Sequence, residues 1–125
     1  MRTQIERIRQ VTAALDIPIY ELEGYEADDL LGTLARQAGA HGVDTLIVTG
    51  DTDILQLVDE QTRVLTSRWR FSDTVTYDVE GVKRRYGLAP AQLVDLKALV
   101  GDKSDNIPGV SGVGEKTAVQ LLQQY

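Results

Sequence analysis

Cysteine is absent from this chain of 125 residues, and histidine occurs only once, at His41. The absence of cysteine excludes disulfides, thiolate zinc sites and cysteine nucleophiles. A single histidine excludes a metal site built from several imidazoles and leaves little room for a Ser-His-Asp triad. Carboxylates therefore become the main candidates for metal or catalytic chemistry.

Long apolar runs are also absent, which excludes a membrane span of about 20 apolar residues. The opening sequence MRTQIERIRQ is charged and lacks the apolar segment of a secretory signal, so we expect a cytoplasmic protein. Apolar residues make up 42% of the chain and charged residues 26%, as in one modest soluble domain.

Hydrophobic periodicity predicts an alternation of helices and strands. We expect helices over residues 4–15, 27–38, 53–57, 79–86, 90–100 and from Glu115 onward, and strands over 17–22, 45–49, 63–67 and 75–77. The continuous apolar run at 45–49 is typical of a strand that is covered on both faces. This order predicts an α/β fold with a parallel sheet.

A change of pattern near Gly87 predicts two regions. Residues 1–86 are expected to form the C-terminal part of an α/β core, and residues 87–125 a helix–loop–helix region. Two or three strands cannot bury a strand on both faces, so we expect the chain to be a piece of a longer domain.

Acidic side chains gather in three short clusters, and the seven residues are Glu26, Asp28, Asp29, Asp51, Asp53, Asp102 and Asp105. The formal net charge of −6 argues at first against a nucleic-acid partner. Setting these seven carboxylates aside leaves the remaining surface slightly basic. The net charge alone therefore does not identify the partner.

Two of the clusters are expected at one edge of the sheet. Asp51 and Asp53 follow the strand at 45–49, while Glu26 and Asp29 begin a helix that follows the strand at 17–22, and ligands bind at this edge in open α/β sheets. Carboxylates without His or Cys suit Mg²⁺ or Mn²⁺, and their number suggests two ions. Acidic residues are also common as helix caps, so spacing alone leaves both interpretations open.

A glycine-dense segment from Asn106 to Ala118 lies between two expected helices. Its glycines permit a tight hairpin, and backbone N–H groups at the start of the next helix could bind a phosphate backbone without reading sequence. Lys97, Lys103 and Lys116 are expected to contact the phosphate backbone of DNA. The alternative is a connection that serves only helix packing.

Four segments in order, Gly24–Asp29, Thr49–Asp53, Gly101–Gly109 and Gly112–Ala118, closely resemble the 5′-nuclease family, which includes the nuclease domain of bacterial DNA polymerase I and the flap endonucleases. The resemblance implies a PIN-like or Rossmann-like nuclease core, of which residues 1–86 would be the C-terminal, metal-binding part. It implies the function of a structure-specific 5′-3′ exonuclease or 5′-flap endonuclease of DNA replication and repair. It implies two Mg²⁺ or Mn²⁺ ions held by the seven carboxylates, and a metal-activated water in place of a side-chain nucleophile.

The same resemblance implies a helix–three-turn–helix that holds K⁺ against duplex DNA. The DNA-binding residues it implies are Lys103, Gly109, Val110, Ser111, Gly112, Val113, Gly114, Lys116 and Thr117. The implied partner is duplex DNA with a 5′ flap, a nick or a single-stranded 5′ end, and in some relatives a polymerase belongs to the same chain.

The sequence departs from the family at its start. Relatives have earlier strands that carry two more acidic ligands, and a helical arch with basic residues. Because these are not found before Met1, we expect the chain to bind divalent ions weakly and to be inactive or nearly so by itself.

Two alternative functions stay open from the sequence. In a haloacid-dehalogenase-type phosphatase, Asp51 would be the nucleophile and Asp53 the general acid, although Gly50 separates Asp51 from the strand. A non-catalytic DNA-binding module would use only the hairpin. Residues 68–71 (Arg-Trp-Arg-Phe) fit either base stacking or packing at a strand turn, and Lys83 to Arg85 are expected to be a solvated helix face.

Overall fold

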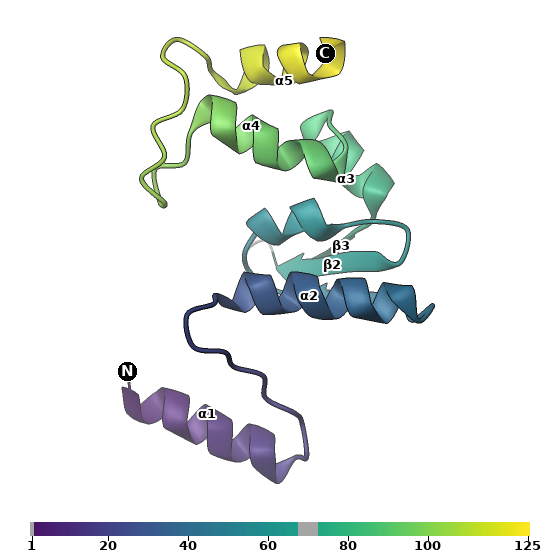
Figure 1. Cartoon of the computed structure of the whole chain (residues 1–125), viewed down its shortest axis with the longest axis vertical. Helices are drawn as coiled ribbons and strands as arrows, with labels where there is room; N and C mark the ends of the chain where they lie inside the picture. The colour runs from purple at the N-terminus through teal and green to yellow at the C-terminus, as the bar shows by residue number, and fades with distance from the viewer. Residues whose placement is uncertain (1, 68–72) are drawn as a thin grey trace. The chain divides into compact units, whose positions relative to one another are not determined.

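The computed structural model describes residues 2–67 and 73–125, so the Arg-Trp-Arg-Phe stretch at 68–71 lies outside the described residues. The chain divides into two compact units, one ending at Thr33 and the other running from Leu34 to Tyr125. In chain order (Figure 1), the elements are α1 (Arg2–Ala14), α2 (Ala27–Ala40), β1 (Thr45–Val48), the 3₁₀ helix η1 (Asp53–Leu57), β2 (Thr62–Ser67), β3 (Thr74–Tyr77), α3 (Val79–Tyr86), the 3₁₀ turn η2 (Pro90–Gln92), α4 (Leu93–Val100) and α5 (Glu115–Gln124).

The first unit consists of α1, an irregular segment and the first half of α2. Helix α1 was predicted, and its apolar stripe of Ile5, Ile8 and Val11 is exposed. The prediction of a strand at Ile17–Leu22 is wrong, because this segment is irregular. A strand is stable only when a neighbour completes its hydrogen-bond ladder, and β-branched residues alone do not supply that neighbour.

The second unit contains a three-stranded sheet with the order β1-β2-β3. β1 and β2 are parallel, and η1 lies in the connection between them. β3 runs antiparallel to β2, which corrects the expectation of a purely parallel sheet. β1 is an edge strand in this sheet, with Ile47 buried but Leu46 and Val48 exposed. Within the described residues this strand is therefore not covered on both faces, in agreement with the expectation that two or three strands cannot do so.

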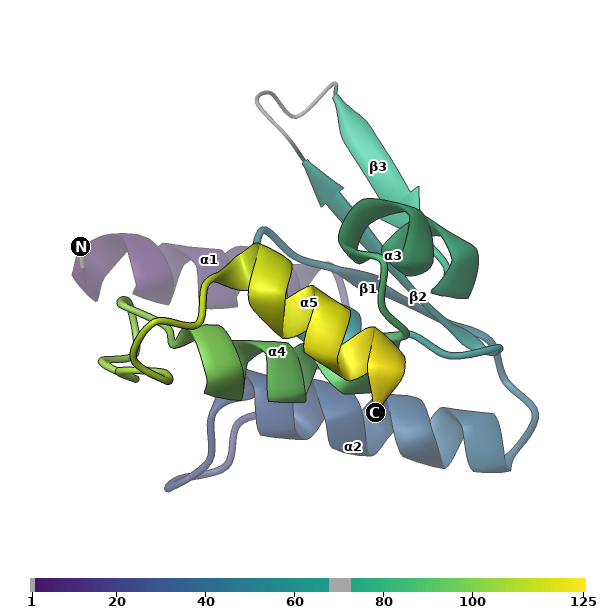
Figure 2. The same ribbon diagram turned by 90° about the horizontal axis from the view of Figure 1, so that it is seen from above.

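Local signals set the ends of α3, which lies beside β3 (Figure 2). The Asp78 carboxylate accepts a hydrogen bond of 2.6 Å from the Gly81 amide and caps the helix start. Gly87 ends the helix in the left-handed conformation, with φ of 71°. Both ends were predicted from the sequence, because capping depends on residues only a few positions apart.

Helices α4 and α5 pack against each other at the C-terminal end of the chain (Figure 1). The Gln92 side chain donates a hydrogen bond of 2.7 Å to the Leu122 carbonyl, and Gln123 donates one of 2.8 Å to the Gly87 carbonyl. Ala118 is fully buried on α5. These contacts hold the last helix, and with it the loop that precedes it, against the rest of the second unit.

The core of the second unit is centred on η1, β2 and α3, where Ile54, Leu55, Val64 and Val82 have at most 1% of their surface exposed. Alternate residues of β2 face this core, and the buried Thr62 and Thr66 extend the same row. The 3₁₀ helix η1 begins at Asp53 and is anchored in this core by its next two residues, Ile54 and Leu55.

We predict that Leu55→Ala lowers the free energy of unfolding by about 2–5 kcal/mol, because it leaves a cavity under η1. Leu46→Ala is the matched control, since Leu46 is 52% exposed on β1 and its truncation should change the stability by about 0.5 kcal/mol or less. Urea denaturation followed by circular dichroism measures both. Equal effects of the two substitutions would contradict this description of the core.

Candidate metal centre and nucleic-acid interface

The turn after β1 places Asp53 at the start of η1. The Asp51 amide donates a hydrogen bond of 3.0 Å to the Thr49 hydroxyl, and the Asp53 amide donates one of 2.9 Å to Asp51 Oδ1. Short polar side chains thus satisfy the backbone where the strand ends. The carboxylate of Asp51 is used in this turn.

The loop after α4 is closed by a short two-residue bridge. The Asp102 amide donates to the Ile107 carbonyl at 2.9 Å, and the Ile107 amide donates to the Asp102 carbonyl at 2.7 Å. Asp102 Oδ1 accepts hydrogen bonds from the amide and the hydroxyl of Ser104, the first at 2.9 Å. This network fixes the direction of the Asp102 carboxylate.

Two glycines allow the base of this loop to close. A Cβ on Gly109 would lie 2.5 Å from the Gly101 nitrogen and from the Val100 carbonyl group, closer than real Cβ atoms approach. Gly101 and Gly109 also have positive φ values of 85° and 68°. The close approach of the two backbone segments therefore requires glycine at both positions.

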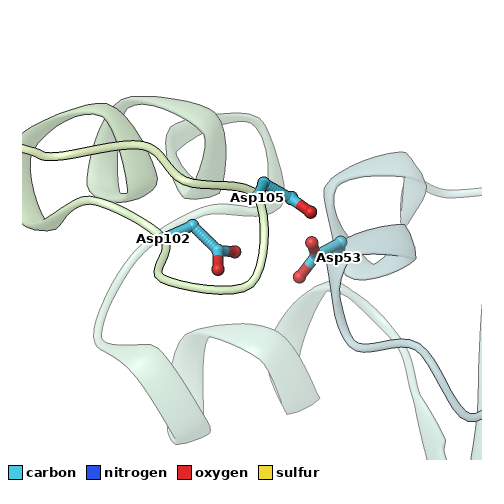
Figure 3. A group of neighbouring side chains, drawn as sticks. All are labelled: Asp53, Asp102 and Asp105. Atoms are coloured by element: carbon cyan, nitrogen blue, oxygen red, sulfur yellow. The ribbon is translucent and has the colours of Figure 1, made fainter.

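These two segments bring three carboxylates together. One carboxylate oxygen from each of Asp53, Asp102 and Asp105 lies within 4.8 Å of the others. Figure 3 shows the three side chains directed toward a common point, Asp53 from η1 and the other two from the loop after α4. Asp53 and Asp102 are half-buried and Asp105 is exposed. We refer to these three residues as the carboxylate cluster.

Lys97 of α4 lies between two members of the cluster. Its Nζ is 2.5 Å from Asp102 Oδ2 and forms a second ion pair with Asp53 Oδ2. Desolvation alone would lower the pKa of Lys97, but hydrogen bonds to Asp102 and Asp53 raise this pKa above its usual value. Hydrogen bonds from Lys97 and then from Ser104 hold the pKa of Asp102 well below its usual range.

The directions of these pKa shifts determine when the ion pair stabilises the fold. The contribution of Asp102 is present above the pKa of an unfolded aspartate and is lost as the pH falls through the lower folded-state pKa. The contribution of Lys97 is present below the ordinary lysine pKa and is lost as the pH rises through the raised one. Both groups are therefore charged throughout the neutral range.

The donor set of the carboxylate cluster fits a hard divalent cation, because it offers only carboxylate oxygens, from three residues on two segments. An ion there would complete its coordination with water, as Mg²⁺ commonly does. The structure brings together three of the seven acidic residues singled out in the sequence. Asp51 is not one of them, and its carboxylate accepts a hydrogen bond in the turn after β1.

The other three acidic residues lie in the first unit, at the beginning of α2. The Glu26 amide donates a hydrogen bond of 3.0 Å to Asp29 Oδ2, so Asp29 serves as a cap at the start of this helix. Asp28 is in the first helical turn, where a negative charge is favourable. That Glu26, Asp28 and Asp29 join the carboxylate cluster stays a prediction.

The glycine hairpin connects the carboxylate cluster to α5. The Val110 amide donates to the Leu99 carbonyl at 2.8 Å, and the Val113 amide donates to the Val110 carbonyl at 3.0 Å. Gly112 has a φ of 81° and open space around its Cα. Five other residues that were predicted to bind DNA are exposed: Lys103, Ser111, Gly114, Lys116 and Thr117. The first turn of α5 therefore presents backbone N–H groups and Lys116 to solvent.

Family models match the whole chain. Residues 1–87 match the N-terminal resolvase-like domain of the 5′-3′ exonucleases, and residues 88–125 match the C-terminal SAM fold of the same enzymes. The chain belongs to the 5′-3′ exonuclease family. This assignment leaves no support for a haloacid-dehalogenase-type phosphatase.

Relatives of this exonuclease-family chain include bacterial DNA polymerases I. The chain is 59% identical to that of Chloroflexus aurantiacus and 49% identical to that of Bacillus caldotenax, in each case over 98% of its own length. It spans only 13% and 14% of the length of these two proteins. The similarity therefore concerns one part of a much longer protein.

Solved structures share the fold. A zinc-bound T5 5′-exonuclease matches with a TM-score of 0.79 at 23% identity, over 90% of this chain and 41% of the other. The catalytic core of Rad2 in complex with a DNA substrate matches with a TM-score of 0.66 at 22% identity, over 100% of this chain and 37% of the other. Among the helices of residues 2–67 and 73–125, none combines the length and hydropathy of a membrane span.

Two residues of the site were missed or assigned differently from the sequence. Lys97 was expected to contact a DNA backbone, but in the structure it pairs with Asp53 and Asp102. Ser104 was not singled out, although a serine two residues after an aspartate is a common turn pattern that could have indicated the hydrogen bond. No local signal reveals the pairing of Lys97 with Asp53, which is 44 positions earlier.

We predict that Gly109→Ala opens the loop base, because its Cβ would meet the backbone of Val100 and Gly101. Gly112→Ala is the matched control, since it has the same left-handed backbone but free space, and should cost only about 1 kcal/mol. Amide hydrogen exchange at Asp102 and Ile107 should accelerate in the first variant and change little in the second. Unchanged protection in Gly109→Ala would contradict the close approach.

Proposed function

We propose that this chain carries the metal-binding and DNA-binding parts of a structure-specific 5′-3′ exonuclease or 5′-flap endonuclease. The observation that carries the proposal is the carboxylate cluster at the end of a β-strand, joined through one closed loop to a glycine hairpin. Membership of the 5′-3′ exonuclease family agrees with it. A module that only binds DNA would not need Asp53, Asp102 and Asp105 within 4.8 Å of one another.

In this proposal the acidic residues hold two divalent ions, Mg²⁺ or Mn²⁺. Asp53, Asp102 and Asp105 would hold one, with Asp51, Glu26, Asp28 and Asp29 completing the set. Bound divalent ions supply an activated water and stabilise the charge that develops on a phosphodiester. The bridge between Asp102 and Ile107 and the hydrogen bonds from Ser104 hold Asp102 in position.

The hairpin and the start of α5 supply the proposed DNA contact. Backbone N–H groups from Gly114 onward, together with Lys103 and Lys116, suit a phosphate backbone and read no bases. We further propose that the turn from Gly109 to Gly114 binds K⁺, and that the DNA partner is a duplex with a 5′ flap or a nick. Residues 1–86 would then belong to the nuclease core of a cytoplasmic, nucleoid-associated enzyme. Residues 87–125 would form its DNA-binding region and also supply Asp102 and Asp105 to the metal site.

The proposed activity belongs to the longer protein. The chain covers 13–14% of the length of the two DNA polymerases I described above. We therefore propose that the isolated 125-residue chain binds divalent ions but cleaves DNA poorly.

We predict that Asp53→Asn and Asp105→Asn each weaken Mn²⁺ binding by about tenfold or more, because each removes one charged oxygen ligand from the cluster. Isothermal titration calorimetry measures the affinity. Asp44→Asn is the control, since this exposed acid lies outside the cluster and is 4.0 Å from Arg63. Equal Mn²⁺ affinity in all variants would refute the metal site.

A separate prediction addresses the DNA interface. Lys116→Gln should weaken duplex binding and reduce the slope of log K against log salt concentration by about 0.9, the value for one lost phosphate contact. Lys83→Gln is the control, because Lys83 already pairs with Glu80 at 2.8 Å on α3. Fluorescence anisotropy at several salt concentrations measures both, and an unchanged slope for Lys116→Gln would contradict the proposed interface.

A further inference from the structure

The ammonium group of Lys97 contacts the same carboxylates that are proposed to bind a divalent ion. It forms ion pairs with Oδ2 of Asp53 and Oδ2 of Asp102, the second at 2.5 Å. Their cluster partner Asp105 contributes an oxygen within 4.8 Å of both carboxylates. The positive charge is thus placed among the ligands, and not at the rim of the site.

A lysine ammonium and a divalent cation compete for such a position. Both are compact, strongly hydrated point charges that seek the same oxygen lone pairs. Two cations in contact with the same oxygens repel each other strongly in a site that is only partly open to water. The side chains of Lys97, Asp53 and Asp102 have 36%, 29% and 13% of their surface exposed, so screening by water is incomplete.

The surroundings give Lys97 a place to move to. A pocket of about 460 Å³ borders Asp53 and Lys97, and Leu93, Leu96 and Ile107 contribute apolar walls. Thr52 and Gln56 line the same pocket and offer hydrogen-bond acceptors. A flexible four-carbon stem anchored on α4 can therefore change rotamer without leaving the second unit.

We propose that Lys97 is a positioning residue that acts as a built-in competitor for the metal ion. Its ammonium holds Asp53 and Asp102 together and exchanges with the divalent cation at the carboxylate cluster. This inference rests on the proposed metal site. It adds that the Lys97 ammonium holds the carboxylates of the site in place and thereby lowers their affinity for the divalent ion. If Lys97 only positioned the carboxylates, its removal would weaken metal binding and not strengthen it.

The test compares Mn²⁺ binding by the 125-residue chain with that of three variants, using electron paramagnetic resonance of free Mn²⁺. Lys97→Met keeps the length of the stem and removes the charge, and it should bind Mn²⁺ about tenfold more tightly than the unsubstituted chain. Lys97→Arg keeps the charge and should restore the lower affinity. Lys83→Met removes a lysine that pairs with Glu80 outside the cluster, and should leave the affinity unchanged.

Thermal unfolding supplies a second readout. Without metal, Lys97→Met should unfold at a lower temperature, because three carboxylates then repel one another without a counter-charge. Saturating Mn²⁺ should raise the unfolding temperature of Lys97→Met by more than that of the unsubstituted chain, since ligand stabilisation follows affinity.

The outcomes separate this inference from the proposed metal site. Mn²⁺ binding by the unsubstituted chain with equal or lower affinity in Lys97→Met would overturn the exchange and leave the site intact. Absence of Mn²⁺ binding in both proteins would overturn the site and the exchange together. A Lys97→Met variant that stays unfolded at saturating Mn²⁺ would show that the ammonium is required for structure, and would also overturn the exchange.

Discussion

The second unit must hold three negatively charged carboxylates close together, and its other features depend on this constraint. The carboxylates of Asp53, Asp102 and Asp105 approach within 4.8 Å although they repel one another. Lys97 offsets part of this repulsion by pairing with two of them, and Ser104 donates further hydrogen bonds to Asp102. Core residues on one side and loop hydrogen bonds on the other supply the rigidity that keeps the charges in place.

The rigidity has two separate sources, and each belongs to a different segment. Asp53 is placed by burial, because Ile54 and Leu55 directly after it are almost completely covered. Asp102 is placed by backbone pairing with Ile107, which the close contact of Gly101 and Gly109 permits. The same closed loop leads into the hairpin before α5, so Asp102 and Asp105 of the carboxylate cluster and the proposed DNA contact share one connection.

The sequence predicted those features that depend on neighbouring residues. The limits of α3, from its Asp78 cap to Gly87, follow from signals within one or two helical turns. The grouping of Asp53 with Asp102 and Asp105 was expected from the family resemblance alone. The rule of sheet topology instead placed Asp51 and Asp53 beside Glu26 and Asp29, and spacing left helix caps as an equal alternative. Asp29 shows the value of that alternative, because its carboxylate does cap α2.

Features that depend on distant partners were not predicted correctly. The segment Ile17–Leu22 has the composition of a strand but no paired neighbour in the described part of the chain. β3 pairs antiparallel with β2, and the strand-like composition of Thr74–Tyr77 does not state the direction of that pairing. Lys97 pairs with Asp53 across 44 positions, and a lysine on a helix gives no indication of such a partner.

The charge balance links the two proposed binding events. A chain with a formal net charge of −6 repels a polyanion unless its carboxylates are neutralised. Seven of those carboxylates lie in the three clusters, and two divalent ions bound there would reduce the formal net charge from −6 to −2. Lys97 already neutralises part of this charge within the chain. Metal ions would therefore have an electrostatic role in DNA binding as well as a chemical one, and both roles depend on the carboxylates that Lys97 holds together.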